Sequence, residues 1–226
     1  LSALKKENHL MLYGTLFKSR LPPSPKKQPY FLVGNYRKQY FEKHKEFYKK
    51  LIEDALPIFK KEKKTVFYAP TWEDREKGFC LKRAERLFKA FPKELQLVVK
   101  FHPNTWEKRE LLILSWKCTY EGSIFFLENL PDIFPFFSYF DAYIGDTSSI
   151  AYDWLLTEKP LYFFTQKRNR QIFDYGEKLS IKNLQSSLCK SAYKNNEKRR
   201  SFVEKAFAKN PCWKSLKASL TAVSHS

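Results

Sequence analysis

Residues 95–104 read LQLVVKFHPN, in which a short apolar run over residues 95–101 ends abruptly in histidine, proline and asparagine. A run of this length without strict alternation is typical of a strand that is buried on both faces of a sheet. Similar runs occur at residues 65–68, 123–127, 142–144 and 161–164. Helical stretches separate them, at residues 81–91, 106–114, 132–139 and 149–156. Strands that alternate with helices predict an α/β fold with a doubly wound parallel sheet.

The segments on either side of this alternating region have a different character. Residues 9–15 and 30–34 each resemble a strand that runs into a glycine, and the proline-rich, basic stretch 22–27 between them predicts an extended connector. Residues 38–59 are predicted to form one lysine-rich helix, and residues 184–207 one or two basic helices.

Charge is the strongest compositional signal. The chain of 226 residues has 42 Lys and Arg against 24 Asp and Glu, a formal net charge of +18. Such an excess favours an anionic partner, which could be a phosphate-rich substrate, a nucleic acid or an anionic membrane surface. No RNP-like, helix-turn-helix or zinc-finger pattern accompanies the charge, so a nucleic-acid partner is disfavoured.

Cysteines and apolar runs exclude several other classes of protein. The four cysteines, Cys80, Cys118, Cys189 and Cys212, lie far apart, which predicts free thiols rather than a zinc site or a disulfide framework. No apolar run reaches the roughly 20 residues that span a bilayer, and no signal peptide opens the sequence. The first residue is Leu1 rather than Met, which indicates a fragment or a processed chain.

Polar residues follow each predicted strand, where ligands bind in open α/β sheets. The stretches are 69–74, 102–104, 128–129, 146–149 and 166–168. Asp146 with Ser148 and Ser149 would begin a helix whose free N–H groups suit a phosphate, or would simply cap that helix. His102 could exchange protons, donate to a diphosphate or cap a loop.

Three further side chains have both a functional and a structural interpretation. Trp72 could stack on a base or pack on its own loop, and Arg37 could pair with a phosphate or remain an ordinary exposed arginine. Asp153 could contact a ribose or link neighbouring loops. The common hydrolase, P-loop and dinucleotide motifs are absent from the sequence.

Taken in order, these blocks resemble the CDP-glycerol glycerophosphotransferases, the teichoic-acid primases and polymerases of bacterial cell walls. The similar blocks span roughly residues 10–176: YGTxxK at 13–18, GxxR at 34–37, YAPTW at 68–72, KFHP at 100–103, DTSSxxxD at 146–153 and KP at 159–160. YAPTW and DTSS are the most specific of them.

The resemblance implies a fold and an activity. The family has a GT-B-like architecture of two Rossmann-like domains, and its members are peripheral membrane proteins on the cytoplasmic face. They transfer glycerol phosphate from CDP-glycerol to a lipid-linked acceptor and release CMP, with no metal or other cofactor expected. By this resemblance residues 1–37 are a remnant of the acceptor-side domain, 38–180 are the CDP-donor-binding domain, and 181–226 are basic helices that pack back on it.

The resemblance also implies roles for single residues. Thr71 and Trp72 would lie against the cytidine or its phosphates, and Arg37 and His102 would neutralise or protonate the diphosphate. Ser148 and Ser149 would hold phosphate, and Asp153 would contact the nucleotide. The same blocks place Gly14, Thr15, Pro70, Lys100 and Asp146 at the substrate.

One departure from the family pattern weakens the catalytic prediction. The first block of the family usually carries a histidine, a candidate general base, where this sequence has Tyr13. A phenol with a pKa near 10 is a poor base at neutral pH. The arginine that usually precedes His-Pro is also replaced, by Lys100. The sequence therefore leaves two readings open, an active transferase with Tyr13 at the catalytic position, or a weakened or inactive member that binds a nucleotide or an anionic membrane.

Overall fold

The computed structural model describes residues 10–18, 21, 30–55, 62–71, 79–128, 130, 132–164, 171–189, 196–209 and 217. The chain divides into two compact units. The larger unit comprises residues His44–Asn196, and the smaller one combines Leu1–Lys43 with Glu197–Ser226. The expected domain boundaries after residues 37 and 180 stay a prediction.

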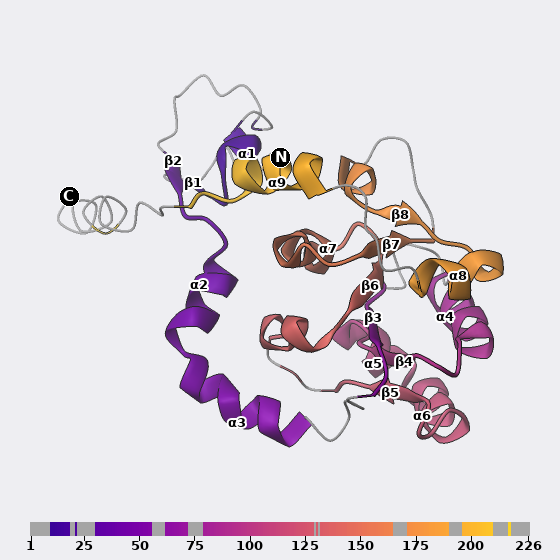
Figure 1. Ribbon diagram of the computed structural model, residues 1–226. Helices are drawn as coiled ribbons and strands as arrows, with labels where there is room; N and C mark the ends of the chain where they lie inside the picture. Colours follow the sequence, from indigo (N-terminus) through magenta and orange to yellow (C-terminus); the bar gives the residue numbers. More distant parts are fainter. Residues whose placement is uncertain are drawn as a thin grey trace. The chain divides into compact units, whose positions relative to one another are not determined.

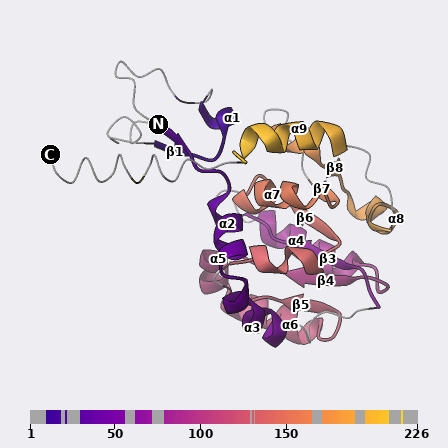
Figure 2. The same ribbon diagram turned by 60° about the vertical axis from the view of Figure 1, so that its left-hand side comes forward.

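A six-stranded parallel sheet forms the centre of the larger unit, and its strands lie side by side in two views (Figures 1 and 2). Its strands are β3 (Thr65–Tyr68), β4 (Gln96–Val99), β5 (Ile124–Phe126), β6 (Ala142–Gly145), β7 (Leu161–Phe163) and β8 (Glu177–Lys178). They lie in the order β5-β4-β3-β6-β7-β8, and every neighbouring pair is parallel. This is the order of dinucleotide-binding folds, so the predicted doubly wound sheet is confirmed.

Burial explains why the strands form where they do. Every residue of β3, β4, β6 and β7 is buried, as expected for strands that are covered on both faces. Only the short edge strand β8 is exposed, and its two charged residues gave no apolar signal for prediction.

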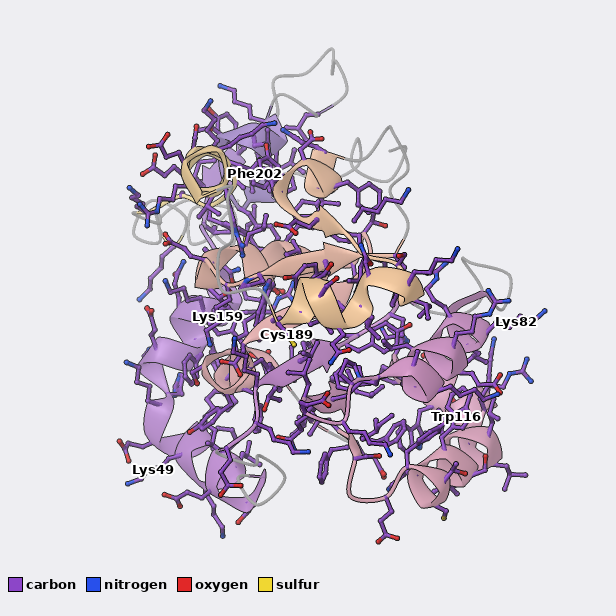
Figure 3. The ribbon with its side chains drawn as sticks, turned by 45° about the vertical axis from the view of Figure 1, so that its right-hand side comes forward. Lys49, Lys82, Trp116, Lys159, Cys189 and Phe202 are labelled. Atoms are coloured by element: carbon purple, nitrogen blue, oxygen red, sulfur yellow. The ribbon has the colours of Figure 1, made fainter. Side chains whose placement is uncertain are left out.

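Helices cover both faces of this sheet. They are α3 (Lys45–Ala55), α4 (Phe79–Ala90), α5 (Pro103–Lys108), α6 (Glu110–Thr119), α7 (Ser149–Trp154) and α8 (Leu184–Leu188), with 3-10 turns η4 (Phe134–Tyr139), η5 (Leu155–Thr157), η6 (Gln171–Tyr175) and η7 (Ile181–Asn183). Figure 1 shows α4 and α8 on one side of the sheet and α7 on the other. Lys49 on α3 and Lys82 on α4 point away from the sheet, whereas Trp116 on α6 points inward (Figure 3).

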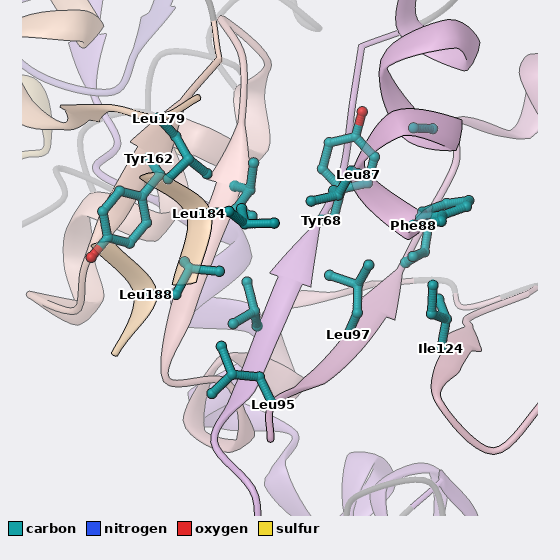
Figure 4. Close-up of a cluster of buried hydrophobic side chains, with 14 of the residues drawn as sticks. Tyr68, Leu87, Phe88, Leu95, Leu97, Ile124, Tyr162, Leu179, Leu184 and Leu188 are labelled. Carbon is teal, nitrogen blue, oxygen red and sulfur yellow. The ribbon is translucent and has the colours of Figure 1, made fainter. Parts of the chain in front are cut away.

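The two faces of the sheet have cores of different chemistry. On one face aliphatic side chains dominate, where α4 contributes Leu87 and Phe88 and α8 contributes Leu184 and Leu188 (Figure 4). On the other face aromatic rings stack on one another. Phe67 lies 4.5 Å from Phe140 between ring centroids, and Tyr143 lies 5.4 Å from Phe67 and 5.7 Å from Trp154.

The smaller unit joins residues from both ends of the chain. Its strands β1 (Leu10–Leu12) and β2 (Tyr30–Leu32) pair in parallel, and its helices are α1 (Thr15–Lys18), α2 (Tyr36–Lys43) and α9 (Asn196–Ala206). The Ala208 amide donates to the Tyr13 carbonyl at 2.7 Å. Gly34 has φ +66, and a Cβ there would collide with the Ala208 carbonyl. The close approach of these two segments therefore requires glycine at position 34.

Three helix predictions need correction. The single helix expected over residues 38–59 is broken at His44 into α2 and α3. The helix expected at 106–114 begins earlier, at Pro103, because proline suits the first turn, and it breaks at Arg109, whose φ of −133 is not helical. The stretch 132–139 forms a 3-10 helix over Phe134–Tyr139 rather than an α-helix.

No helix in the described part of the chain is long and apolar enough to cross a membrane. Cys118 and Cys189 are exposed free thiols, as expected. The side chains of the other two cysteines lie outside the described residues.

Candidate functional site

The topology of the sheet points to one edge as the site. The first strand of the sheet, β3, has β4 on one side and β6 on the other, so chain crossovers leave it in opposite directions. Ligands of such sheets bind beyond the carboxyl ends of the strands at this switch point. The loops after β3 and β6, residues 69–71 and 146–148, flank it.

Asp146 ties these two loops together. Its carboxylate accepts hydrogen bonds from the backbone N–H of Thr71, in the loop after β3, and from that of Ser148 at 3.1 Å. The side chain is buried, with 8% exposure. Asp146 therefore does not cap α7, and the residue at the cap position is Ser148, whose side chain makes no capping bond.

Tyr143 makes a second bridge between the same loops, and sequence reasoning missed it. Its hydroxyl donates to the Ala69 carbonyl at 3.1 Å and lies 3.3 Å from the Ser148 hydroxyl. Burial, and secondarily the charge of Asp146, raise the pKa of Tyr143 well above its usual 10. The phenol therefore stays protonated and remains a hydrogen-bond donor at physiological pH.

The loop after β3 also carries a hydroxyl that lacks a partner. Thr71 Oγ1 is buried and has no hydrogen-bond partner among the described residues. Buried hydroxyls are ordinarily satisfied, by protein, water or ligand. Pro70 is buried beside it, and Trp72 lies outside the described residues.

Lys100 and His102 follow β4, the neighbour of β3. His102 begins α5, and its Nδ1 accepts a hydrogen bond from the Asn104 amide at 3.2 Å. This bond assigns the proton of a neutral ring to Nε2. Burial, and then the charge of Lys100, lower the pKa of His102 below 6.5, and burial alone lowers that of Lys100 below 10.5.

The remaining predicted residues of the larger unit lie on α7. Ser149, its first residue, is exposed, whereas Asp153 is buried with 5% exposure. The negative charge of Asp153 contributes to the raised pKa of Tyr143. The carboxylates of Asp146 and Asp153 and the hydroxyl of Tyr143 thus form one electrostatically linked group.

Four predicted site residues, Tyr13, Gly14, Thr15 and Arg37, belong to the smaller unit. Arg37 donates from Nη to the Tyr13 hydroxyl at 3.5 Å, and the Tyr13 ring stacks on Tyr36 at 5.6 Å. Burial is the largest cause that raises the pKa of Tyr13, and Arg37 opposes it. The Thr15 hydroxyl donates to the Lys205 carbonyl at 3.3 Å, and a Cβ on Gly14 would collide with the same turn of α9.

The structure thus brings the predicted residues into two groups, each within its own unit. Thr71, Asp146 and Ser148 are joined by hydrogen bonds at the switch point, and Tyr13 with Arg37 form a pair of their own. The described residues include no cluster of three or more metal-ligating side chains. The predicted loops at 128–129 and 166–168 fall wholly or partly outside the described residues.

A sequence model of the family CDP-glycerol:poly(glycerophosphate) glycerophosphotransferase matches residues 33–207. The chain belongs to this glycerophosphotransferase family. The match includes every described loop at the switch point and the Lys100–His102 segment. A search among curated proteins found no match.

Solved structures of larger enzymes have the same fold as this chain. The wall teichoic acid polymerase TagF superposes with a TM-score of 0.62 at 18% identity, over 88% of this chain and 53% of TagF. A histidine variant of TagF soaked with CDPG gives a TM-score of 0.55 at 16% identity, over 88% and 51% of the two chains. The chain therefore spans about half the length of TagF.

A second enzyme class has the same fold. The UDP-GlcNAc 2-epimerase of Methanocaldococcus jannaschii, in complex with UDP-GlcNAc and UDP, has a TM-score of 0.55 at 13% identity. The match covers 88% of this chain and 60% of the epimerase. These likenesses confirm the predicted Rossmann-like half of a GT-B-type fold.

Proposed function

We propose that the chain binds CDP-glycerol at the switch point and takes part in transfer of glycerol phosphate to a lipid-linked or polymeric cell-envelope acceptor, with release of CMP. The family match over residues 33–207 carries this proposal. The polar loops that meet beside β3, and the unsatisfied hydroxyl of Thr71, support a ligand at that edge.

The chemistry of the loops favours a diphosphate near the end of β4. The Lys100 ammonium supplies positive charge there, and Nε2–H of neutral His102 supplies a hydrogen-bond donor. In the transfer the acceptor hydroxyl attacks the phosphorus that carries glycerol, the bond to CMP breaks, and the hydroxyl proton passes to a base. Catalysis of such a step rests on positioning and on neutralising phosphate charge.

The other residue roles are part of the same proposal. Thr71 and Trp72 contact the cytidine or its phosphates, and Ser148 and Ser149 bind phosphate. Asp153 contacts the nucleotide. By the same proposal Arg37 neutralises phosphate charge, and Gly14 and Thr15 bind substrate.

Calorimetric titration of the chain with CDP-glycerol tests the proposal, with CMP and UMP as controls. We expect saturable binding that prefers cytidine over uridine, and weaker binding after His102→Ala. The substitution His44→Gln, outside the predicted site, serves as the matched control and should leave affinity unchanged. Absence of saturable binding, or equal affinity for CMP and UMP, would contradict the proposed donor.

A second candidate function is that of a binding protein with little or no transferase activity. The state of Tyr13 favours it, because burial raises the pKa of a phenol that is already a poor base at neutral pH. We expect Tyr13→His to increase the rate of CMP release in the presence of acceptor, while Tyr13→Phe leaves donor affinity unchanged. Robust turnover by the natural chain that Tyr13→His does not increase would exclude this candidate.

A further inference from the structure

The side chain of Tyr143, within β6, extends to the carboxyl edge of the sheet, and Gly145 leaves room for it. Residues two apart in a strand point to the same face, so Tyr143 and Gly145 share one face of β6. A Cβ at position 145 would collide with Cζ and the hydroxyl of Tyr143. The Tyr143 ring therefore occupies the space above Gly145, and its hydroxyl lies beside the loop that follows the strand.

The position of that hydroxyl couples two loops that the sheet alone would not join. It donates to the carbonyl of Ala69, after β3, and lies 3.3 Å from the hydroxyl of Ser148, after β6. Around the ring, Phe67 and Trp154 pack at 5.4 and 5.7 Å between centroids, and Tyr143 is fully buried. The phenol is thus enclosed by packing, and both polar contacts of its hydroxyl lie at the switch point.

We infer that Tyr143 is a positioning residue of the donor site, which fixes the Ser148 hydroxyl and its distance from the loop after β3. The inference rests on the proposed function for the identity of the ligand. Tyr143 acts through Ser148 and not on the ligand: when the Ser148 hydroxyl donates to a phosphate oxygen, its oxygen can accept the phenol proton across the 3.3 Å contact, in which either oxygen can be the donor. It prepares the site before the ligand arrives, so that less ordering is needed on binding.

The substitution Tyr143→Phe removes only the hydroxyl and keeps the packed ring. We expect affinity for CDP-glycerol, measured by calorimetric titration, to fall about 3- to 10-fold, the range that corresponds to one net hydrogen bond. Tyr162→Phe is the matched control. Tyr162 is a buried tyrosine of the adjacent strand β7, and its hydroxyl donates to the Ser187 carbonyl at 2.9 Å, towards α8. It should lose comparable thermal stability and keep its affinity.

A double-substitution cycle separates positioning from a general loss of stability. If the Tyr143 hydroxyl acts through Ser148, then Ser148→Ala should lower affinity in the natural background and have a much smaller effect in the Tyr143→Phe background. Additive effects would overturn the inference. Affinity of Tyr143→Phe equal to that of the natural chain, or reduced no more than in Tyr162→Phe, would also overturn it and leave the proposed function standing.

Amide hydrogen exchange tests the same inference without any ligand. The backbone N–H groups of Thr71 and Ser148 both donate to Asp146, so they report on the two loops that Tyr143 joins. We expect both to exchange several-fold faster in Tyr143→Phe and at the natural rate in Tyr162→Phe. If the natural chain binds no CDP-glycerol, the proposed function fails, and unchanged exchange rates would then show separately that Tyr143 positions nothing.

Discussion

His102 shows how the surroundings of a single residue at a strand end favour its uncharged form. Its Nδ1 accepts a hydrogen bond from the Asn104 amide, which a doubly protonated ring could not do. Burial and Lys100 both lower its pKa, so the folded state favours the neutral ring. Because the folded pKa is depressed, this contribution to stability is present above the unfolded pKa of about 6.5 and is lost as pH falls below it.

The charge of Lys100 can be removed to test this account. We expect Lys100→Met to raise the pKa of His102 towards 6.5, because the nearby positive charge is one of its two causes of depression. The remaining depression comes from burial, so the pKa should not reach the value of a free histidine. An NMR titration of the histidine ring signals measures it, with Lys89→Met on the exposed face of α4 as the control. An unchanged or lower His102 pKa would contradict the assignment.

Some residues of the candidate site could be predicted from the sequence and others could not, for a physical reason. Thr71, His102 and Asp146 are polar residues directly after apolar runs, so the strand-end rule found them. Tyr143 lies within an apolar run and has the appearance of a core residue. Its role depends on the direction of its hydroxyl over Gly145, and the only sequence signal for it is the glycine two residues further along the strand.

Among the elements, η4 is held by a lysine from a distant loop. The last carbonyls of a helix lack partners within the helix. Lys159, in the turn before β7, donates from Nζ to the carbonyls of Phe137, Ser138 and Phe140 at 3.1, 2.9 and 2.6 Å. The next residue, Pro160, accepts from the indole N–H of Trp154 at 3.0 Å, so the Lys-Pro pair connects η4 and α7 to the sheet.

Loss of this lysine should destabilise the larger unit. We expect Lys159→Met to lower the free energy of unfolding by about 1–3 kcal/mol, because three carbonyls, two of them in partly buried hydrogen bonds, lose a charged donor. Urea unfolding followed by tryptophan fluorescence measures it. Lys182→Met, at an exposed position in η7, is the matched control and should change stability by less than about 0.5 kcal/mol. Equal effects of the two substitutions would refute this role for Lys159.

Prediction of the elements succeeded where periodicity was strong and failed where local geometry decided. The five apolar runs became strands within two residues of their expected bounds, since burial on both faces leaves a clear pattern. Periodicity could not show the breaks at His44 and Arg109, because the lysine-rich and leucine-rich patterns continue across them. The 3-10 helix η4 was predicted as an α-helix because its aromatic residues are spaced like the apolar face of a helix. Pro135 in its first turn is compatible with either kind of helix, so the sequence did not distinguish them.

At the scale of the whole molecule, the net charge of +18 dominates long-range behaviour. A field of this size attracts anionic surfaces and weakens as salt screens it. We therefore propose that the protein is a peripheral protein on the inner face of the cell membrane, where it would meet the proposed lipid-linked acceptor. Lysines such as Lys49 and Lys82, which point outward from the larger unit, contribute to this field (Figure 3).

Vesicle sedimentation tests the membrane proposal. We expect the chain to bind phosphatidylglycerol vesicles at low ionic strength and to be released as salt is raised towards about 0.5 M, where the Debye length falls below roughly 5 Å. Vesicles of phosphatidylcholine alone provide the neutral control and should retain little protein. Equal binding to both vesicle types would rule out an electrostatic attachment.

The smaller unit has a consequence for the way the protein is made. Its strands β1 and β2 are translated before the larger unit, yet the residues that close against Gly14 and Gly34 lie at the end of α9 and just after it, about 170 to 190 residues later. During synthesis β1 and β2 therefore stay exposed to solvent while the sheet of the larger unit is translated and folds. Nascent chains stalled before residue 196 should be cut by protease within residues 30–43, and chains stalled well after residue 209 should be protected there.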